Sequence, residues 1–345
     1  MTSTRETRFV EMRPGSVVLR REASRLLPSG WGRVRVAACG VCGTDLHLFR
    51  GMDLPRGATY PVRPGHEVAG VLVEASGEGP TVETEVVLHP LLPCAECPAC
   101  RAGAENLCRS AAILGIEQPG GLADEVLWPL ARMVAAPGVA AEQAAVLADA
   151  VASAQHALEV ADVPAGGALT VIGAGGVGTQ ILQLARLHDP SVRLSAVVRS
   201  EGTARRLEEL GLGIATVAAG AGAARRLLEI AGPQDAVVEF GAATEAANEG
   251  PAMLARGRRL VFGSIDEMPV ALATTISSLV TRELQVRGAY SSTLADLATV
   301  AGLAASGRLD LSGSVSHRVP LERAAEAMDL LERRPPGMAR VVVVP

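Results

Sequence analysis

Residues 168–188 read ALTVIGAGGVGTQILQLARLH: an apolar run, a glycine-rich turn and a segment with helical spacing of apolar residues. Three glycines form G-x-G-x-x-G directly after the expected strand and at the start of the expected helix, which is the context that a dinucleotide-binding motif requires. They permit a tight turn, a close approach to a pyrophosphate and close packing of helix on strand. The alternative is a glycine-rich turn without a ligand. The residues assigned to this loop are Gly173, Gly175, Gly176, Val177 and Gly178.

Apolar strands and helical segments alternate after this stretch. The run RLSAVV (193–198) precedes EGTARRLEELG (201–211), and DAVVEFG (235–241) precedes TEAANEGPAMLARG (244–257) and RRLVFGS (258–264). Repeated strand and helix segments indicate a parallel sheet covered by helices on both faces. The sequence therefore predicts a doubly wound α/β domain over residues 151–285.

The end of the second strand bears on the choice between NAD and NADP. NAD-binding domains place an acidic residue about 20 residues past the glycine loop, where it binds the adenosine ribose. Here that position is Val198, followed by Arg199 and Ser200, with Arg205 further along. Arginine without the acidic residue favours NADP. Arg199 stacked on the adenine is the alternative.

The segments on either side differ from this domain. Residues 1–150 contain short valine-rich runs broken by Gly and Pro, such as GRVRVAACG (32–40) and HEVAGVLVEA (66–75). This pattern is typical of an all-β unit whose loops carry sites. After about residue 286 a helical segment and a last strand, ARVVVVP (339–345), form a third part, 286–345.

Composition narrows the class of protein. The 345 residues are 48% hydrophobic and 20% charged, with a net charge of −5, and all 32 basic residues are arginine. The absence of a basic run argues against nucleic acid as a partner. The first fifteen residues have no apolar core, so we expect no secretory signal. The uncharged stretch 163–185 contains a proline, two glutamines and GAGGVG, which argues against a membrane span. We expect a cytoplasmic protein.

Four of the six cysteines form one cluster with the spacing C-x2-C-x2-C-x7-C. Six cysteines in a cytoplasmic chain indicate metal binding or catalysis before disulfides. Four thiolates can close a tetrahedral shell around Zn²⁺ with no open position, which is typical of a structural site. An iron–sulfur cluster is the alternative, although its bacterial motif has a shorter last gap and a following proline. The cluster contains Cys94, Cys97, Cys100 and Cys108.

A second set of candidate ligands surrounds CGVCGTDLH (39–47). RPGHEVAG (63–70) adds a histidine and a glutamate, and VLADAVASAQH (146–156) adds an aspartate. One thiolate, one imidazole and one or two carboxylates can make an open, catalytic zinc shell.

Together these motifs, with the closing GRLDLSGSVSHRVPLERAAEAMDLL (307–331), resemble the zinc-containing medium-chain dehydrogenase/reductase family, the group of alcohol, polyol and threonine dehydrogenases. The resemblance covers essentially the whole chain in the right order. It implies a GroES-like β-barrel catalytic domain with an inserted Rossmann domain, and a final segment that returns to the catalytic domain.

The resemblance also implies the metal ligands. Cys42 and His66 correspond to the thiolate and imidazole ligands of a catalytic zinc. Glu67 and Asp149 compete as the carboxylate ligand, and the sequence does not rank them. Cys39 is expected to be a small buried bystander.

A proton relay is implied next to this site. Thr44 corresponds to the hydroxyl that takes the substrate proton, and His47 to the outer end of the relay. Asp45 corresponds to a carboxylate that orients His66. The alternative is that Thr44 is only a turn residue and His47 a surface histidine.

The implied activity is hydride transfer between an alcohol or carbonyl, expected to be a secondary one, and NAD(P), with two Zn²⁺ per chain. Alternatives on the same fold are a lyase or epimerase that uses hydride transiently, or a non-catalytic binding protein. By analogy we expect a homodimer or homotetramer with a small-molecule substrate.

Overall fold

The computed structural model describes residues 6–55, 57–241, 244–265, 269–335 and 338–345. The chain divides into two compact units, Met1–Ala152 with Thr293–Pro345, and Ser153–Ser292. Within the described ranges, no helix combines the length and the apolar character needed to cross a lipid bilayer.

The first unit is built on a seven-stranded sheet. Its order is β16-β17-β3-β4-β5-β9, and β8 also pairs with β3; all neighbours are antiparallel except β16 and β17. Its strands are β3 (Trp31–Val41), β4 (Glu67–Ala75), β5 (Glu85–Leu88), β8 (Glu125–Pro129), β9 (Met133–Ala135), β16 (Val315–Pro320) and β17 (Arg340–Val344).

Smaller elements complete this unit. The further strands are β1 (Glu6–Arg13), β2 (Ser16–Ala23), β6 (Leu91–Leu92) and β7 (Ala112–Ile113). The helices are α1 (Gly43–Phe49), α2 (Pro98–Arg101), α3 (Ala141–Val146), α11 (Leu294–Ala305) and α12 (Ala324–Arg333). Short 3₁₀ helices are η1 (Glu105–Leu107), η2 (Leu130–Arg132) and η4 (Leu321–Arg323). The element η3 (Leu147–Val151) is a short π-helix.

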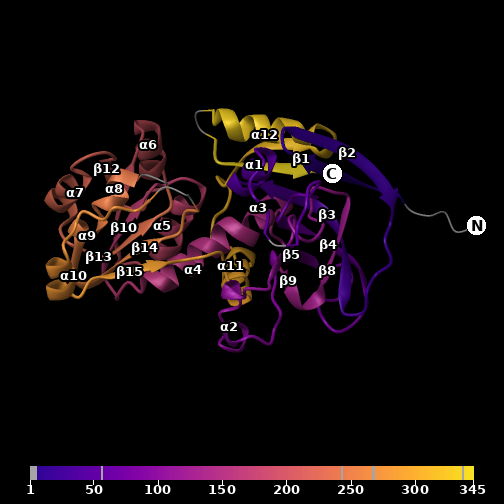
Figure 1. Cartoon of the computed structure of the whole chain (residues 1–345), viewed down its shortest axis with the longest axis horizontal. Helices are drawn as coiled ribbons and strands as arrows, with labels where there is room; N and C mark the ends of the chain where they lie inside the picture. The colour runs from indigo at the N-terminus through magenta and orange to yellow at the C-terminus, as the bar shows by residue number, and fades with distance from the viewer. Residues whose placement is uncertain (1–5, 56, 242–243, 266–268, 336–337) are drawn as a thin grey trace, which may run out of the picture. The chain divides into compact units, whose positions relative to one another are not determined.

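The two ends of the chain share one core. Apolar side chains that alternate along β3 pack with Met12 from β1 and Trp128 from β8, and with Met328 from α12. Figure 1 shows the yellow α12 lying against the indigo β2. The run of valines in β17 is buried because it lies between β16 and β3. The C-terminal segment is therefore an integral part of this sheet.

The second unit contains a six-stranded parallel sheet of order β12-β11-β10-β13-β14-β15. This is the strand order of dinucleotide-binding doubly wound domains. Figure 1 shows its strands between α7 and α9 on one side and α4 and α5 on the other. The strands are β10 (Ala168–Ile172), β11 (Arg193–Val198), β12 (Ala215–Ala218), β13 (Gln234–Glu239), β14 (Leu254–Phe262) and β15 (Gln285–Gly288).

The helices of this unit are α4 (Ala152–Ala161), α5 (Gly176–His188), α6 (Glu201–Glu209), α7 (Ala223–Ala231), α8 (Thr244–Asn248), α9 (Gly250–Met253) and α10 (Ile276–Arg282). The α/β fold class, with a mostly antiparallel unit and a doubly wound parallel sheet, is confirmed.

One local prediction was wrong. The helix expected over 244–257 is broken into α8 and α9 and ends at Met253, because Pro251 lacks the donor of a continuous helix and Leu254 already pairs with Gln234 in the sheet. The short strands β12 and β15 were not predicted. The strand expected over 258–264 corresponds to the second half of β14, and β15 lies beyond it at the edge of the sheet.

Candidate functional site

Cys42 follows the last residue of β3 and is the N-cap of α1. Its Sγ accepts a hydrogen bond from the backbone N–H of Thr44 at 3.2 Å, and its own N–H donates to the Asp45 carboxylate at 3.0 Å. These two bonds form a reciprocal capping box, which fixes the direction of the thiol at the helix start. The sequence CGTD is therefore a structural unit that aims a sulfur into the interior.

Three more donor groups converge on this sulfur. His66 Nε2 lies 3.2 Å from Cys42 Sγ and 3.8 Å from Asp149 Oδ2. Glu67 is the first residue of β4, and Asp149 lies on the π-turn η3. The four side chains each offer a ligand atom, and all four atoms lie within 4.8 Å of one another. π-turns inside helices occur frequently at functional sites.

Gly40 and Arg340 place the Glu67 side chain. Gly40 pairs with Glu67 across β3 and β4, and a Cβ at Gly40 would lie 2.1 Å from Glu67 Oε2. Arg340 Nη2 lies 2.8 Å from Glu67 Oε1 and 3.9 Å from Asp149 Oδ2. Burial raises the pKa of the Glu67 carboxyl to about 7, against the opposing effect of Arg340. Glu67 therefore occupies a slot that the missing side chain at Gly40 leaves open.

This donor set fits zinc. Tetrahedral Zn–S and Zn–N bonds place sulfur and nitrogen ligands about 3.5 Å apart, close to the 3.2 Å between Cys42 Sγ and His66 Nε2. Neither Glu67 oxygen, both buried, forms a hydrogen bond of normal geometry within the described structure. A mixed sulfur, nitrogen and oxygen shell is typical of a catalytic site.

The residues of the expected proton relay lie on α1. Thr44 is half-buried and His47 is exposed, three residues further along the same helix. Asp45 is fully buried, and its Oδ2 lies 3.9 Å from His66 Nδ1. That separation exceeds a hydrogen bond. Asp45 can therefore act on His66 through its charge, while its hydrogen bond goes to the N–H of Cys42.

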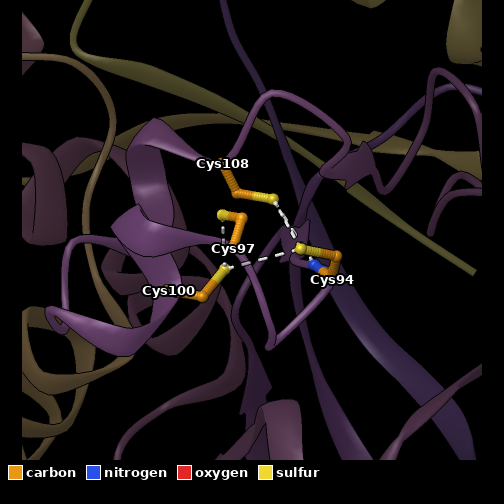
Figure 2. A group of neighbouring side chains, drawn as sticks. All are labelled: Cys94, Cys97, Cys100 and Cys108. Carbon is orange, nitrogen blue, oxygen red and sulfur yellow. Dashed lines mark hydrogen bonds between the residues drawn. The ribbon is translucent and has the colours of Figure 1, made fainter.

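The four remaining cysteines face one another in a loop around α2 (Figure 2). The Sγ–Sγ distances are 3.5 Å between Cys97 and Cys100, 3.6 Å between Cys94 and Cys108, and 4.0 Å between Cys94 and Cys100. Four thiolates around one Zn²⁺ lie about 3.8 Å apart. A hydrogen bond from the Cys94 N–H is the main cause that lowers the pKa of the Cys108 thiol to about 6. The cluster fits a closed zinc shell.

A buried network that the sequence did not reveal holds this loop. Glu105, on η1, accepts a hydrogen bond from the N–H of Leu294 at 2.8 Å and lies 3.5 Å from Arg132. Arg132 donates to the carbonyl of Leu91 at 3.0 Å and contacts His89 Nδ1 at 2.6 Å. The cysteine loop is therefore fixed to both the sheet region and the start of α11.

The glycine loop has the geometry that its motif predicts. Gly173 has a φ of +90°, which favours glycine, and a Cβ at Gly178 would lie 2.0 Å from the Gly173 carbonyl oxygen. Gly175 is the N-cap of α5 and is exposed, as is Gly176, whereas Val177 is half-buried. Free backbone N–H groups at the start of a helix can bind phosphate.

The end of β11 carries no carboxylate. Val198 is its last residue and is buried, whereas Arg199 and Ser200 are exposed. Ser200 caps α6 by accepting a hydrogen bond from the N–H of Thr203 at 3.2 Å. Arg205 lies 3.5 Å from Glu201, which is also exposed at the start of α6. A cation and an anion therefore both lie close to the position expected for the ribose.

The structure adds two residues that the sequence analysis missed. Arg340 lies beside the carboxylates with its side chain 12% exposed. Gly241 lies against Gly173 so closely that a Cβ at Gly241 would be 2.6 Å from Gly173 Cα. An arginine at the start of the buried run VVVV was a signal for Arg340, because a buried guanidinium needs a carboxylate partner. No local signal indicated Gly241.

Comparisons with known proteins agree with this geometry. A model of the alcohol dehydrogenase GroES-like domain matches residues 28–138. A probable zinc-binding alcohol dehydrogenase of Mycobacterium tuberculosis is 31% identical, with 90% of this chain and 82% of that protein aligned. A 2-dehydro-3-deoxy-L-galactonate 5-dehydrogenase of Pseudoalteromonas atlantica is 28% identical, over 91% of this chain and 92% of its own.

Similarity to solved structures agrees with these relatives. The solved structure of a cobalt- and zinc-bound thermostable alcohol dehydrogenase from Pyrobaculum aerophilum has a TM-score of 0.85 at 25% identity, and the match covers 99% of this chain and 100% of that one. The chain belongs to the zinc-containing medium-chain dehydrogenase/reductase family.

The slot at Gly40 generates a test of the site's packing. In Gly40→Ala the new methyl group would displace the Glu67 carboxylate from Arg340, so we expect the free energy of unfolding to fall by about 1–3 kcal/mol. Urea denaturation measures this change. Gly43→Ala is the matched control, because a Cβ at Gly43 would have no atom within 4 Å. Equal free energies of unfolding of the two variants would show that the stability of the protein does not depend on the open slot beside Gly40.

Proposed function

We propose that this protein is a zinc-dependent, NAD(P)-linked alcohol dehydrogenase or carbonyl reductase. The unit with the seven-stranded sheet is the catalytic domain, and the parallel-sheet unit binds the dinucleotide. The observation that carries the proposal is the convergence of Cys42, His66, Glu67 and Asp149 in the first unit. The glycine loop in the second unit supports it independently.

The mechanism starts from the donor groups. Cys42 and His66 would hold a zinc ion, which would supply Lewis-acid chemistry to the substrate when bound. Of the two carboxylates, we assign Asp149 as the ligand, because Arg340 lies nearer to Glu67 and holds it by charge. Glu67 would then be a second carboxylate that could bind the zinc if its ion pair with Arg340 opened.

Thr44 and His47 move the proton. The backbone N–H that donates to Cys42 Sγ belongs to Thr44 itself, so Thr44 is the residue next to the thiolate proposed as a zinc ligand. We propose that Thr44 Oγ1 takes the proton of the alcohol and that the exposed imidazole of His47 releases it to water. In the reductive direction the same groups deliver the proton.

The four-cysteine loop has a structural role in this proposal. A closed shell of four thiolates leaves no position for substrate. Zinc at Cys94, Cys97, Cys100 and Cys108 would stabilise a loop whose two short helices, α2 and η1, bury little apolar surface.

The activity is tested with a panel of secondary alcohols, polyols and their carbonyl counterparts, assayed with both NAD and NADP. We expect a net change in nicotinamide absorbance, and two zinc ions per chain by elemental analysis. Consumption of substrate without a net absorbance change would indicate the lyase or epimerase chemistry instead.

Cys42→Ala and Cys39→Ala form a matched pair for the catalytic centre. We expect Cys42→Ala to lose one zinc per chain and all turnover, because it removes the only sulfur donor of the cluster. Cys39→Ala should retain two zinc ions and most of the activity, because Cys39 lies in the apolar core and is not among the residues whose donor atoms converge around Cys42. Two zinc ions in Cys42→Ala would contradict the ligand assignment.

NADP is the dinucleotide that we favour. The support is the apolar end of β11 at Val198, followed by the exposed Arg199 and Ser200. Arg199 would bind the 2′-phosphate by a charge-assisted hydrogen bond.

We expect Arg199→Ala to raise the Kd for NADP about tenfold and the Kd for NAD less than about twofold, because an interaction with a charged group contributes roughly 1.5–3 kcal/mol. Titration of nicotinamide fluorescence with the reduced cofactors measures both. Arg225→Ala on α7 is the control, since Arg225 is exposed and its ion pair is with Glu229, one turn along the same helix. An equal rise in the Kd for both cofactors, or a strong preference of the unmutated chain for NAD, would refute this assignment.

We also propose a homodimer or homotetramer. The edge strand β15 exposes Val286, and the adjacent α10 exposes Ile276 and Val280, which is an unusual concentration of apolar surface. We expect light scattering after gel filtration to give an oligomer, and Val286→Arg to give a smaller species. Ile230→Arg, at an exposed apolar residue of α7, should leave the mass unchanged.

A further inference from the structure

The last residue of β13, Glu239, is a buried carboxylate that the proposed function does not yet use. It is 2% exposed. Its Oε1 accepts a hydrogen bond from the N–H of Gly241 at 2.6 Å, and its Oε2 accepts one from the Ser264 hydroxyl. Its backbone carbonyl accepts a third hydrogen bond from the N–H of Gly263 at 2.9 Å. Glu239 thus joins the turn that follows β13 to the turn that follows β14.

The first of these turns lies directly against the glycine loop. A Cβ at Gly173 would be 2.3 Å from Gly241 Cα, so the two backbones touch. The N–H of Phe240 donates to the carbonyl of Ile172 at 2.9 Å, immediately before Gly173. A displacement of Gly241 by even a fraction of an ångström must therefore move the first glycine of the loop.

The turns held by Glu239 are at the carboxyl edge of the parallel sheet. In doubly wound sheets the ligand binds at this edge, beside the strand that precedes the glycine loop. β10 and β13 are neighbours in the sheet, with Ile172 opposite Glu239. The carboxylate is therefore one strand away from the loop that binds the pyrophosphate.

We propose that Glu239 is a positioning residue for the dinucleotide: its carboxylate holds the 240–241 turn against Gly173 and so sets the affinity of the loop for the cofactor. The inference rests on the proposed function, since it requires a dinucleotide at the glycine loop. Glu239 acts through Gly241 and needs no contact of its own with the cofactor.

Asp235 provides a matched control on the same strand. Its Oδ2 accepts a hydrogen bond from the N–H of Ala168 at 2.9 Å, and its Oδ1 lies 2.8 Å from Arg258. Asp235 joins β13 to β10 and β14 at the amino edge of the sheet, whereas the Glu239 carboxylate binds the turns that follow β13 and β14 at the carboxyl edge. Loss of either carboxylate removes hydrogen bonds within one sheet, so a purely structural role predicts similar effects of both.

The test measures the Kd for NADH and NADPH of the full, zinc-loaded chain by nicotinamide fluorescence, together with the melting temperature of each variant. We expect Glu239→Ala to raise the Kd for the preferred cofactor at least about tenfold, because small misplacements at a binding loop have large effects. Its KM for cofactor should rise, while kcat at saturating cofactor changes by less than about threefold. Asp235→Ala should lower the melting temperature and leave the Kd within about twofold.

Conservative variants keep the test valid if Glu239→Ala does not fold. Glu239→Gln keeps an oxygen that can accept from Gly241, so we expect it to recover most of the affinity, and Ser264→Ala removes only the second bond and should have a smaller effect. The inference is overturned if Glu239→Ala and Asp235→Ala change the Kd equally, or if Glu239→Ala leaves it unchanged. Failure of the unmutated chain to bind either dinucleotide would instead refute the proposed function itself.

Discussion

The register of β3 between β4 and β17 is the constraint on which the first unit depends. Gly40 pairs with Glu67 on one side and with Val342 on the other. This pairing brings the thiol that follows β3, the imidazole that precedes β4 and the guanidinium that opens β17 to the same end of the sheet. A slip of one residue would turn every side chain of a strand to the opposite face and scatter these groups. The donor cluster is therefore a consequence of strand register.

The second unit also uses the carboxylates of one strand to hold neighbouring segments in place. Its sheet carries a carboxylate near each end of β13: Asp235 joins the neighbouring strands β10 and β14, and Glu239 joins the turns that follow β13 and β14. At the amino edge the bonds of Asp235 contribute only to the packing of the sheet. At the carboxyl edge the Glu239 carboxylate also determines the position of Gly173, which any bound phosphate would approach. Carboxylates of one strand therefore support packing at one edge of the sheet and the proposed cofactor site at the other.

Much of the fold and part of the site could be predicted from the sequence because their signals are local. The four cysteines and the glycine loop are each defined by spacing within fifteen residues or so, and the structure brings each set together. The strand β3 was evident from valines that alternate with other residues, and β10 from a continuous apolar run. The short strands β12 and β15 lack such runs and were missed. A second short helix, α9, begins around Pro251, where the sequence pattern continued a single helix.

The rest depended on contacts between distant parts of the chain. Gly40 reads as an ordinary strand glycine until β4 places Glu67 over it, and Gly241 becomes significant only beside Gly173. Arg340 is almost 200 residues from Asp149 in sequence and 3.9 Å from it in space. Spacing patterns contain no information about such pairs, because they arise from sheet register and from the return of the chain to its first unit.

The hydrogen bond from Leu294 to Glu105 has a consequence for metal binding. It ties the cysteine loop to the segment that later supplies Arg340, and both donor clusters belong to one compact unit. An ion that binds only the folded state stabilises that state by mass action. Occupancy of the cysteine loop would therefore raise the apparent affinity of the donor cluster around Cys42 for its ion, and chelation of one ion would weaken retention of the other. The two centres would be thermodynamically linked, although the described residues contain no ligand common to both.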